Sequence, residues 1–159
     1  MKIGHICLKN SSSTAAKRFL SIVEGLDRLA IEQHILVADT SLAQRLRALP
    51  FATVGPVVRS PVMAYCLMPP VDVVHVHDDQ GSQAGLLLTL TRSVPFVLAE
   101  GVVAPDSRSP LRKSVLRRAQ AIVDCSERDA ETLLTVYGEA AGPGQNSQRT
   151  PTAGSSGSQ

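Results

Sequence analysis

Four polar side chains that can bind ligands or carry protons lie close together in the middle of the chain. They belong to residues 71–81, VDVVHVHDDQG, where His75, His77, Asp78 and Asp79 are preceded by or interleaved with valines. A short valine-rich run bounded by proline and glycine is typical of a strand buried on both faces of a parallel sheet. Open α/β sheets bind ligands outside the carboxyl ends of their strands. We therefore expect these polar side chains at the edge of a ligand site.

The spacing His75-x-His77 places two imidazoles on the same side of a strand, and His5 on a neighbouring strand is a potential third ligand. Imidazole is a common ligand of zinc and other transition metals. The sequence shows no further cluster of ligands, so we predict a site without a metal, in which His77 and Asp78 contact the substrate. A role for one histidine as a hydrogen-bonded core residue stays open.

The loop of residues 9–13, KNSSS, follows the first predicted strand and precedes a predicted helix. Backbone N–H groups at a helix N-terminus attract phosphates and carboxylates, which makes Ser12 and Ser13 candidate ligand contacts. The alternative is that these serines only cap the helix. The glycine fingerprint GxGxxG and the Walker A lysine pattern are both absent, so the sequence gives poor support for binding of dinucleotides or nucleoside triphosphates.

Strands and helices alternate along the chain. The strands are expected at 2–8, 33–38, 53–59, within 71–81, 95–101 and 120–125, and the helices at 13–30, 41–49, 61–68, 82–92, 110–119 and 126–137. This alternation predicts an α/β fold, a Rossmann-like, doubly wound and mostly parallel sheet with helices on both faces. Pro56 favours an edge position for the third strand, because proline cannot donate to a central ladder.

The predicted helix 110–119 carries a cluster of basic residues. Its expected outward face consists of Arg112, Lys113, Arg117 and Arg118. Its expected inward face consists of Leu111, Val115, Leu116 and Ala119. A solvated face is one interpretation of the basic cluster. The other is contact with an anionic membrane surface, where each basic residue contributes about 1 kcal/mol.

The composition limits the class of protein. The chain has 159 residues, of which 43% are apolar and 3% aromatic, with a formal net charge of +2. Weak charge and few aromatic residues argue against a nucleic-acid partner. Three distant cysteines, Cys7, Cys66 and Cys125, form no disulfide framework, and no apolar stretch is long enough to span a bilayer. We expect a cytoplasmic protein, either free or peripheral to the membrane.

The composition changes after Gly138. Residues 139–159 contain no large apolar side chain and are rich in glycine, serine, proline and glutamine. Such a segment cannot bury enough surface to offset its ordering entropy. We therefore predict one domain at 1–138, whose last helix stops at Gly138, and a disordered tail at 139–159.

Three stretches together resemble the N-terminal half of GT-B glycosyltransferases of the retaining, glycosyltransferase family 4-like group. They are VDVVHVHDDQGSQAGLLL, VPFVLAEG and LRRAQAIVDCSERDAETLLTVYG, and the resemblance covers about residues 2–138. It implies an acceptor-binding domain of a carbohydrate-modifying transferase. A nucleotide-sugar donor is implied only for a complete two-domain enzyme. We therefore expect no cofactor in this chain, and we expect a partner chain that carries the donor domain.

The resemblance also implies where the cleft residues lie. A histidine commonly follows the fifth strand in this family, and the matching position here is Gly101, with Glu100 before it. The expected cleft residues are therefore Ser12, Ser13, His77, Asp78 and Gly101, with Glu100 as the candidate general base. The donor half, with its paired glutamates, has no counterpart in the sequence.

We accordingly predict the acceptor-side half of a glycosyltransferase, inactive without a donor-binding domain, and leave open whether the chain acts as an enzyme. The main alternative is a non-catalytic binding or regulatory module on a Rossmann-like fold. A flavodoxin-like or dehydrogenase-like cofactor binder is a third interpretation. Fold resemblance alone does not choose among these functions.

Overall fold

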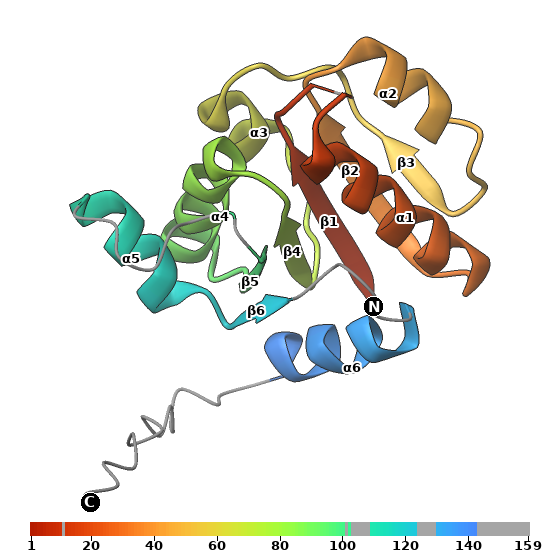
Figure 1. Ribbon diagram of the computed structural model, residues 1–159. Helices are drawn as coiled ribbons and strands as arrows, with labels where there is room; N and C mark the ends of the chain where they lie inside the picture. Colours follow the sequence, from red (N-terminus) through yellow and green to blue (C-terminus); the bar gives the residue numbers. More distant parts are fainter. Residues whose placement is uncertain (11, 101, 103–108, 124–129, 143–159) are drawn as a thin grey trace, which may run out of the picture.

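Six strands form one sheet in the computed structural model (Figure 1). The structure describes residues 1–10, 12–100, 102, 109–123 and 130–142. The strands are β1 (Lys2–Cys7), β2 (Glu32–Val37), β3 (Ala52–Val54), β4 (Val73–Val76), β5 (Phe96–Ala99) and β6 (Ala121–Val123). The helices are α1 (Thr14–Arg28), α2 (Thr40–Leu46), α3 (Pro61–Leu67), α4 (Asp79–Arg92), α5 (Pro110–Arg118) and α6 (Ala130–Ala141).

The sheet has the strand order β3-β2-β1-β4-β5-β6, and every neighbouring pair is parallel. The predicted Rossmann-like α/β fold is confirmed, and the described sheet is fully parallel rather than mostly so. β3 lies at one edge, as Pro56 just after it predicts. In the central pair, His5 of β1 lies directly opposite His75 of β4.

Helices cover both faces of the sheet. In Figure 1, α3, α4 and α5 lie together on one side, while α1 and α6 lie on the other. Side chains of β1 alternate accordingly: Ile6 packs in the core beneath α3, α4 and α5, whereas Ile3 and Cys7 pack beneath the helices of the opposite face. α2 covers this second face as well, through Leu42 and its neighbours.

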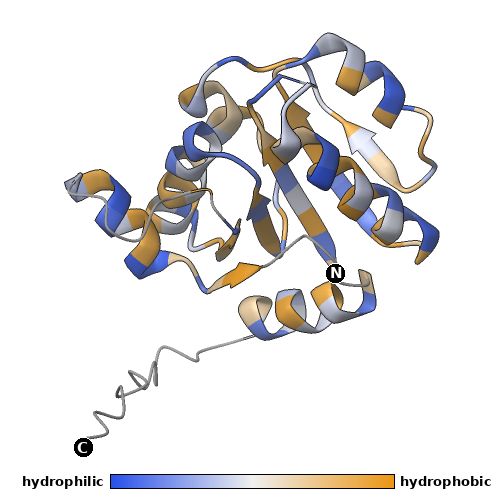
Figure 2. Ribbon diagram, viewed as in Figure 1, coloured by the Kyte–Doolittle hydropathy of each residue, from blue (hydrophilic) through white to orange (hydrophobic). Residues whose placement is uncertain are grey.

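The neighbouring strands β4 and β5 are buried on both faces, which explains their mostly apolar sequences. All four residues of β4 and all four of β5 are buried. Figure 2 shows that the helices, by contrast, carry hydrophilic as well as hydrophobic residues. α1 has the clearest two-sided pattern, with Phe19, Val23 and Leu26 buried and exposed charges on its other side.

Two expectations about the helices are wrong. α6 does not stop at Gly138 but continues to Ala141, because Ala140 and Ala141 are strong helix formers that also pack against the core. Leu111 does not face inward and is 45% exposed. Residues four apart on a helix differ in direction by about 40° around its axis, so Val115 and Ala119 reach the core whereas Leu111, one turn earlier, points away from it.

The basic side chains of α5 are exposed, as expected. They are Arg112, Lys113, Arg117 and Arg118. Arg112 also pairs with Asp79 of α4, at 2.8 Å between Nη2 and Oδ2. None of the described helices combines the length and the apolar character that crossing a membrane requires.

Candidate functional site

A pocket of about 180 Å³ lies at the carboxyl ends of β1, β4 and β5. β1 leads to β2 on one side, and β4 leads to β5 on the other, so the pocket lies where the strand order reverses. Open α/β sheets bind their ligands at such switch points. The pocket is lined by Lys9, Thr14, Ala15, Arg18, His77, Asp78, Ala99, Glu100 and Val102.

Asp78 joins the ends of the two central strands. Its carboxylate accepts hydrogen bonds from the backbone N–H groups of Leu8 and Lys9, and from that of Gly81 at 2.7 Å as the N-cap of α4. Burial raises the pKa of Asp78, opposed by these three N–H groups and by the charge of Lys9. Asp78 lies in the pocket wall, where its oxygens bind the backbone N–H groups of the segments that form the pocket.

Gly81 allows α4 to begin this close to the sheet. A Cβ atom at this position would lie 2.9 Å from Cγ2 of Ile6 and 3.3 Å from Cγ1 of Val76. Both neighbours are fully buried in the core, so neither can move away easily. The glycine that bounds the central sequence stretch is therefore needed to bring Asp78 against the end of β1.

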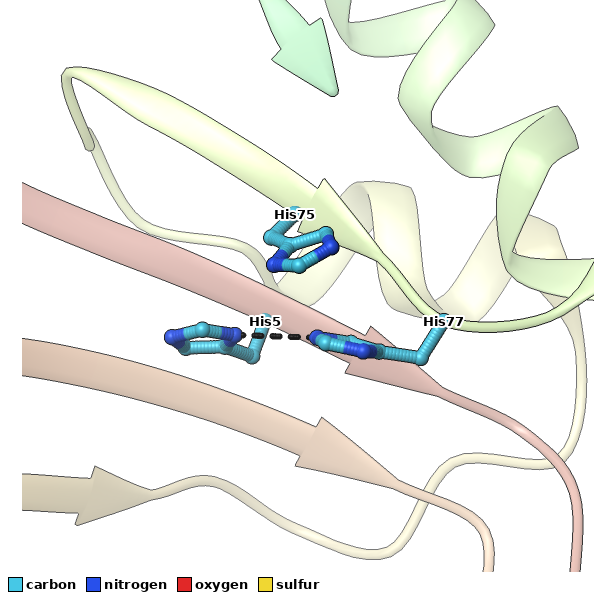
Figure 3. A group of neighbouring side chains, drawn as sticks. All are labelled: His5, His75 and His77. Atoms are coloured by element: carbon cyan, nitrogen blue, oxygen red, sulfur yellow. Dashed lines mark hydrogen bonds between the residues drawn. The ribbon is translucent and has the colours of Figure 1, made fainter. Parts of the chain in front are cut away.

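His77 lies at the inner wall of the pocket and belongs to a buried cluster with His5 and His75 (Figure 3). The three side chains are 2%, 0% and 0% exposed, respectively. His5 Nδ1 and His77 Nε2 lie 3.1 Å apart and share a hydrogen bond. The rings of His75 and His77 are 4.0 Å apart between centroids, and Phe19 of α1 covers His77 at 4.7 Å. Sequence spacing correctly predicted that His75 and His77 share a face.

Burial keeps the imidazoles of this cluster neutral. Desolvation lowers the pKa of His5 to about 3, against a smaller opposing effect of Gln33. Desolvation also lowers the pKa of His75 and of His77 well below the usual range, and their histidine neighbours add to this. At neutral pH each ring therefore has one donor nitrogen and one acceptor nitrogen.

The mouth of the pocket carries exposed charges of both signs. Lys9 and Arg18 are exposed near the N-terminus of α1, and Glu100 is exposed at the end of β5. The Glu100 backbone N–H donates to the carbonyl of Val123 at 2.7 Å, which fixes its position beside β6. At the mouth, these two cations and this carboxylate can bind a ligand that has several hydroxyl groups or an anionic group.

In the first loop, the structure agrees with the capping alternative for Ser13. Ser13 caps α1, and its Oγ accepts a hydrogen bond from the backbone N–H of Ala16 at 3.1 Å. Ser12 is exposed, and neither serine is among the residues that line the pocket. Gly101 lies outside the described residues. Of the predicted cleft residues, the structure brings His77, Asp78 and Glu100 together around one pocket.

Sequence reasoning missed Thr14 and Arg18 as pocket residues. Thr14 and Arg18 are four residues apart on α1 and so lie on the same face of its first turns. That spacing, immediately after the predicted loop, was the available signal. A second pocket of about 420 Å³ also escaped prediction; it is open and lies beside the ends of β1 and β2, with Asp39 and Arg59 in its wall.

Two of the three comparisons with known proteins found no match: no protein-family model and no curated protein sequence matches the chain. Solved structures do. The fold is similar to part of the apo-form glycosyltransferase GlyE of Streptococcus pneumoniae TIGR4, with a TM-score of 0.58, 14% identity, and coverage of 88% of this chain and 33% of GlyE. It is also similar to part of the glycotransferase of kitacinnamycin, with a TM-score of 0.52, 20% identity, and coverage of 89% and 35%. The chain thus spans about a third of each of these proteins and shares the fold of one of their parts.

Proposed function

We propose that this chain is the acceptor-side domain of a GT-B glycosyltransferase of the family 4-like group. In this proposal a separate domain binds the nucleotide-sugar donor, and the chain alone transfers no sugar. The observation that carries the proposal is the pocket at the switch point between β1 and β4. The chain that forms this pocket is similar in fold to about a third of each of two glycosyltransferases. The order of the three sequence stretches that resemble this family supports the same proposal independently of the structure.

The pocket chemistry fits an acceptor better than a nucleotide. Among the described residues that line the pocket, His77 is the one aromatic side chain on which a base could stack, and the first loop has no glycine fingerprint. Lys9, Arg18 and Glu100 instead offer donors and acceptors that hydroxyl or phosphate groups can use. A volume of about 180 Å³ is small compared with the 300–1,000 Å³ of sites that enclose a whole drug-sized ligand. A second domain closing over the mouth would complete such a site.

Glu100 is the proposed contact for the acceptor hydroxyl. Asp78, the other carboxylate of the pocket, already accepts backbone hydrogen bonds, whereas the Glu100 side chain is exposed at the mouth. A general base must lie within hydrogen-bond reach of the proton that it removes. Glu100 would meet that condition for a hydroxyl bound between it and the cations Lys9 and Arg18.

Thermal melting with donor molecules tests the proposal. A ligand at 100 times its dissociation constant stabilises a folded protein by about 2.7 kcal/mol. For a domain of this size, that corresponds to a rise in Tm of roughly 5–15 °C. UDP-, GDP- and ADP-sugars at millimolar concentration should each change the Tm by no more than about 1 °C, and none should be hydrolysed.

The alternative function is a non-catalytic binding module on the same fold. Mixing the chain with a donor-binding domain, such as one encoded next to it, distinguishes the two functions. Transfer of sugar from the donor that appears only in the mixture, and that disappears in Glu100→Gln, supports the transferase domain. Tight binding of a small ligand with no transfer in any mixture favours the binding module.

A further inference from the structure

We propose that His5, His75 and His77 form a binding site for a divalent transition-metal ion of the zinc class, buried beneath α1 and α6. The inference is independent of the proposed transferase function. It rests on the placement of three imidazoles from two neighbouring strands on one face of the sheet (Figure 3). The sequence names His5 as a potential third ligand but predicts no metal, because no further ligand cluster is visible along it; the structure places His5 beside the other two histidines.

The spacing of the ring nitrogens is close to that of a metal site. One nitrogen from each ring can be chosen so that all three lie within 4.8 Å of one another. Zinc–nitrogen bonds of about 2.0–2.1 Å in tetrahedral geometry require nitrogens about 3.3 Å apart. His5 Nδ1 and His77 Nε2 already lie 3.1 Å apart. Coordination requires the third nitrogen to approach the other two to the same spacing.

Polar groups behind two of the rings can orient them for coordination. The hydroxyl of Tyr137 lies 2.7 Å from His75 Nδ1, so His75 would coordinate through Nε2. On the other side, the Nε2 of His5 and the Oε1 of Gln33 are both buried, and neither has a hydrogen-bond partner among the described residues. Gln33 is itself held by a 3.1 Å bond to the carbonyl of Val23. Histidines that bind a metal almost always donate a hydrogen bond from their second ring nitrogen to a neighbouring polar group.

A bound ion would fix the tautomer of His5. If His5 coordinates through Nδ1, its proton lies on Nε2, which is the donor that the buried Oε1 of Gln33 needs. Buried polar groups in native proteins are nearly always paired, so Gln33 is placed to hold His5 in the coordinating tautomer.

The chemistry of the cluster also suits a metal. Imidazoles coordinate in their neutral form, and all three rings are buried away from water. Imidazole ligands favour zinc, copper, nickel and iron over magnesium and calcium. Three protein ligands leave a fourth position, and His77 borders the pocket from which water or an anion can enter. Such an anion would balance the charge of the ion.

The test is a metal titration of the full, untagged chain. The protein is stripped of metal with EDTA, the EDTA is removed, and Co²⁺ is added first, followed by Zn²⁺. We expect the visible bands of tetrahedral Co²⁺ at one equivalent, and their loss when Zn²⁺ displaces it. The variants His5→Gln, His75→Gln and His77→Gln should each lose these bands. His34→Gln is the matched control, because His34 is the remaining histidine of the chain and lies outside the cluster. Its variant should bind Co²⁺ as the parent does.

Two further measurements keep the test decisive if a histidine variant fails to fold. Gln33→Leu and Tyr137→Phe leave all three ligands in place and should weaken Zn²⁺ binding by about 10–100-fold. In the parent protein, ring ¹⁵N shifts should move on addition of Zn²⁺ for His5, His75 and His77 and stay fixed for His34. Absence of Co²⁺ bands, sulfur-to-cobalt charge-transfer absorption, or loss of binding in His34→Gln would each overturn the proposal.

Discussion

The hydroxyl of Tyr137, on α6, lies 2.7 Å from Nδ1 of His75, on the central strand β4. Both side chains are fully buried. The contact connects the last described helix to the middle of the sheet, across 62 residues of sequence. α6 is therefore fixed to the central histidines as well as to the apolar core.

Loss of this hydroxyl should destabilise the fold. We predict that Tyr137→Phe lowers the free energy of unfolding by about 1–3 kcal/mol, because it removes a buried partner of His75. Urea denaturation of EDTA-treated protein measures the effect. Tyr65→Phe is the control: the Tyr65 hydroxyl meets Thr91 at the surface, and its loss should change stability by no more than about 0.5 kcal/mol. Equal effects of the two changes would contradict the structural role of the α6 contact.

Asp78 should contribute more to stability than an ordinary helix cap. Asp78→Ala removes the acceptor for the backbone N–H groups of Leu8, Lys9 and Gly81, and we predict a loss of at least about 2 kcal/mol. Asp39→Ala removes a cap at the exposed start of α2 and should cost about 1 kcal/mol. Urea denaturation of the two variants compares them directly. A loss for Asp78→Ala no larger than that for Asp39→Ala would refute its role in joining β1 to β4.

The neutral histidines predict a marked loss of stability in acid for the metal-free protein. Their folded pKa values lie below the usual 6.5, so the unfolded chain binds protons that the folded chain does not. Their stabilising contribution is complete above pH 6.5 and decreases as the pH falls from there toward the folded value, about 3 for His5. Each histidine should lower the free energy of unfolding by up to about 1.4 kcal/mol per pH unit in this window.

Urea denaturation in EDTA, at several pH values from about 7.5 to 4.5, measures this slope. His77→Gln should reduce the slope by up to about 1.4 kcal/mol per pH unit, whatever its effect on stability at neutral pH. A profile that stays flat below pH 6.5, or a slope unchanged in His77→Gln, would show that the buried rings do not govern acid stability.

The basic face of α5 is proposed to contact anionic membranes. Arg112 is paired with Asp79, so the changes Lys113→Ser, Arg117→Ser and Arg118→Ser should account for most of the effect. Together they should weaken binding to vesicles containing phosphatidylglycerol by up to about 3 kcal/mol, and raised salt should have a similar effect on the parent. Co-sedimentation with vesicles measures the binding.

The control for this experiment removes the same charge from the opposite face. Lys17→Ser, Arg28→Ser and Arg47→Ser change three exposed basic residues on or next to α1 and α2. This variant should bind vesicles as the parent does. If the two triple variants lose binding equally, attraction is due to net charge and α5 has no special role. If the parent does not bind at low salt, the membrane contact is wrong.

The fold could be predicted from the sequence because its signals are local. A valine-rich run indicates β4, an apolar run indicates β5, a helical period indicates α1, and Pro56 indicates the edge position of β3. The end of α6 could not be predicted from Gly138 alone. A glycine inside a helix costs only about 1 kcal/mol relative to alanine, and the packing of the following alanines against the core offsets that cost.

The candidate site was predictable only in part, since it depends on which loops meet. Chain order alone indicated that His77, Asp78 and Glu100 follow strand ends. Asp78, however, bonds to backbone 70 residues away. Which of its oxygens remain for a ligand depends on tertiary contacts that no local pattern encodes. The same holds for Arg18, whose role appears only when α1 is placed beside β4 and β5.

The most direct test of the central claim is an NMR titration of the full, ¹⁵N-labelled chain with two groups of ligands. One group contains neutral sugars and sugar phosphates as acceptor candidates, and the other contains UDP-, GDP- and ADP-sugars as donors. We predict that acceptor candidates shift the amide signals of Lys9, Thr14, Arg18 and Glu100, that Arg18→Ser weakens this binding, and that donors shift none of them. Donor binding in this pocket, or sugars that bind only elsewhere on the chain, would contradict the assignment of an acceptor-side domain.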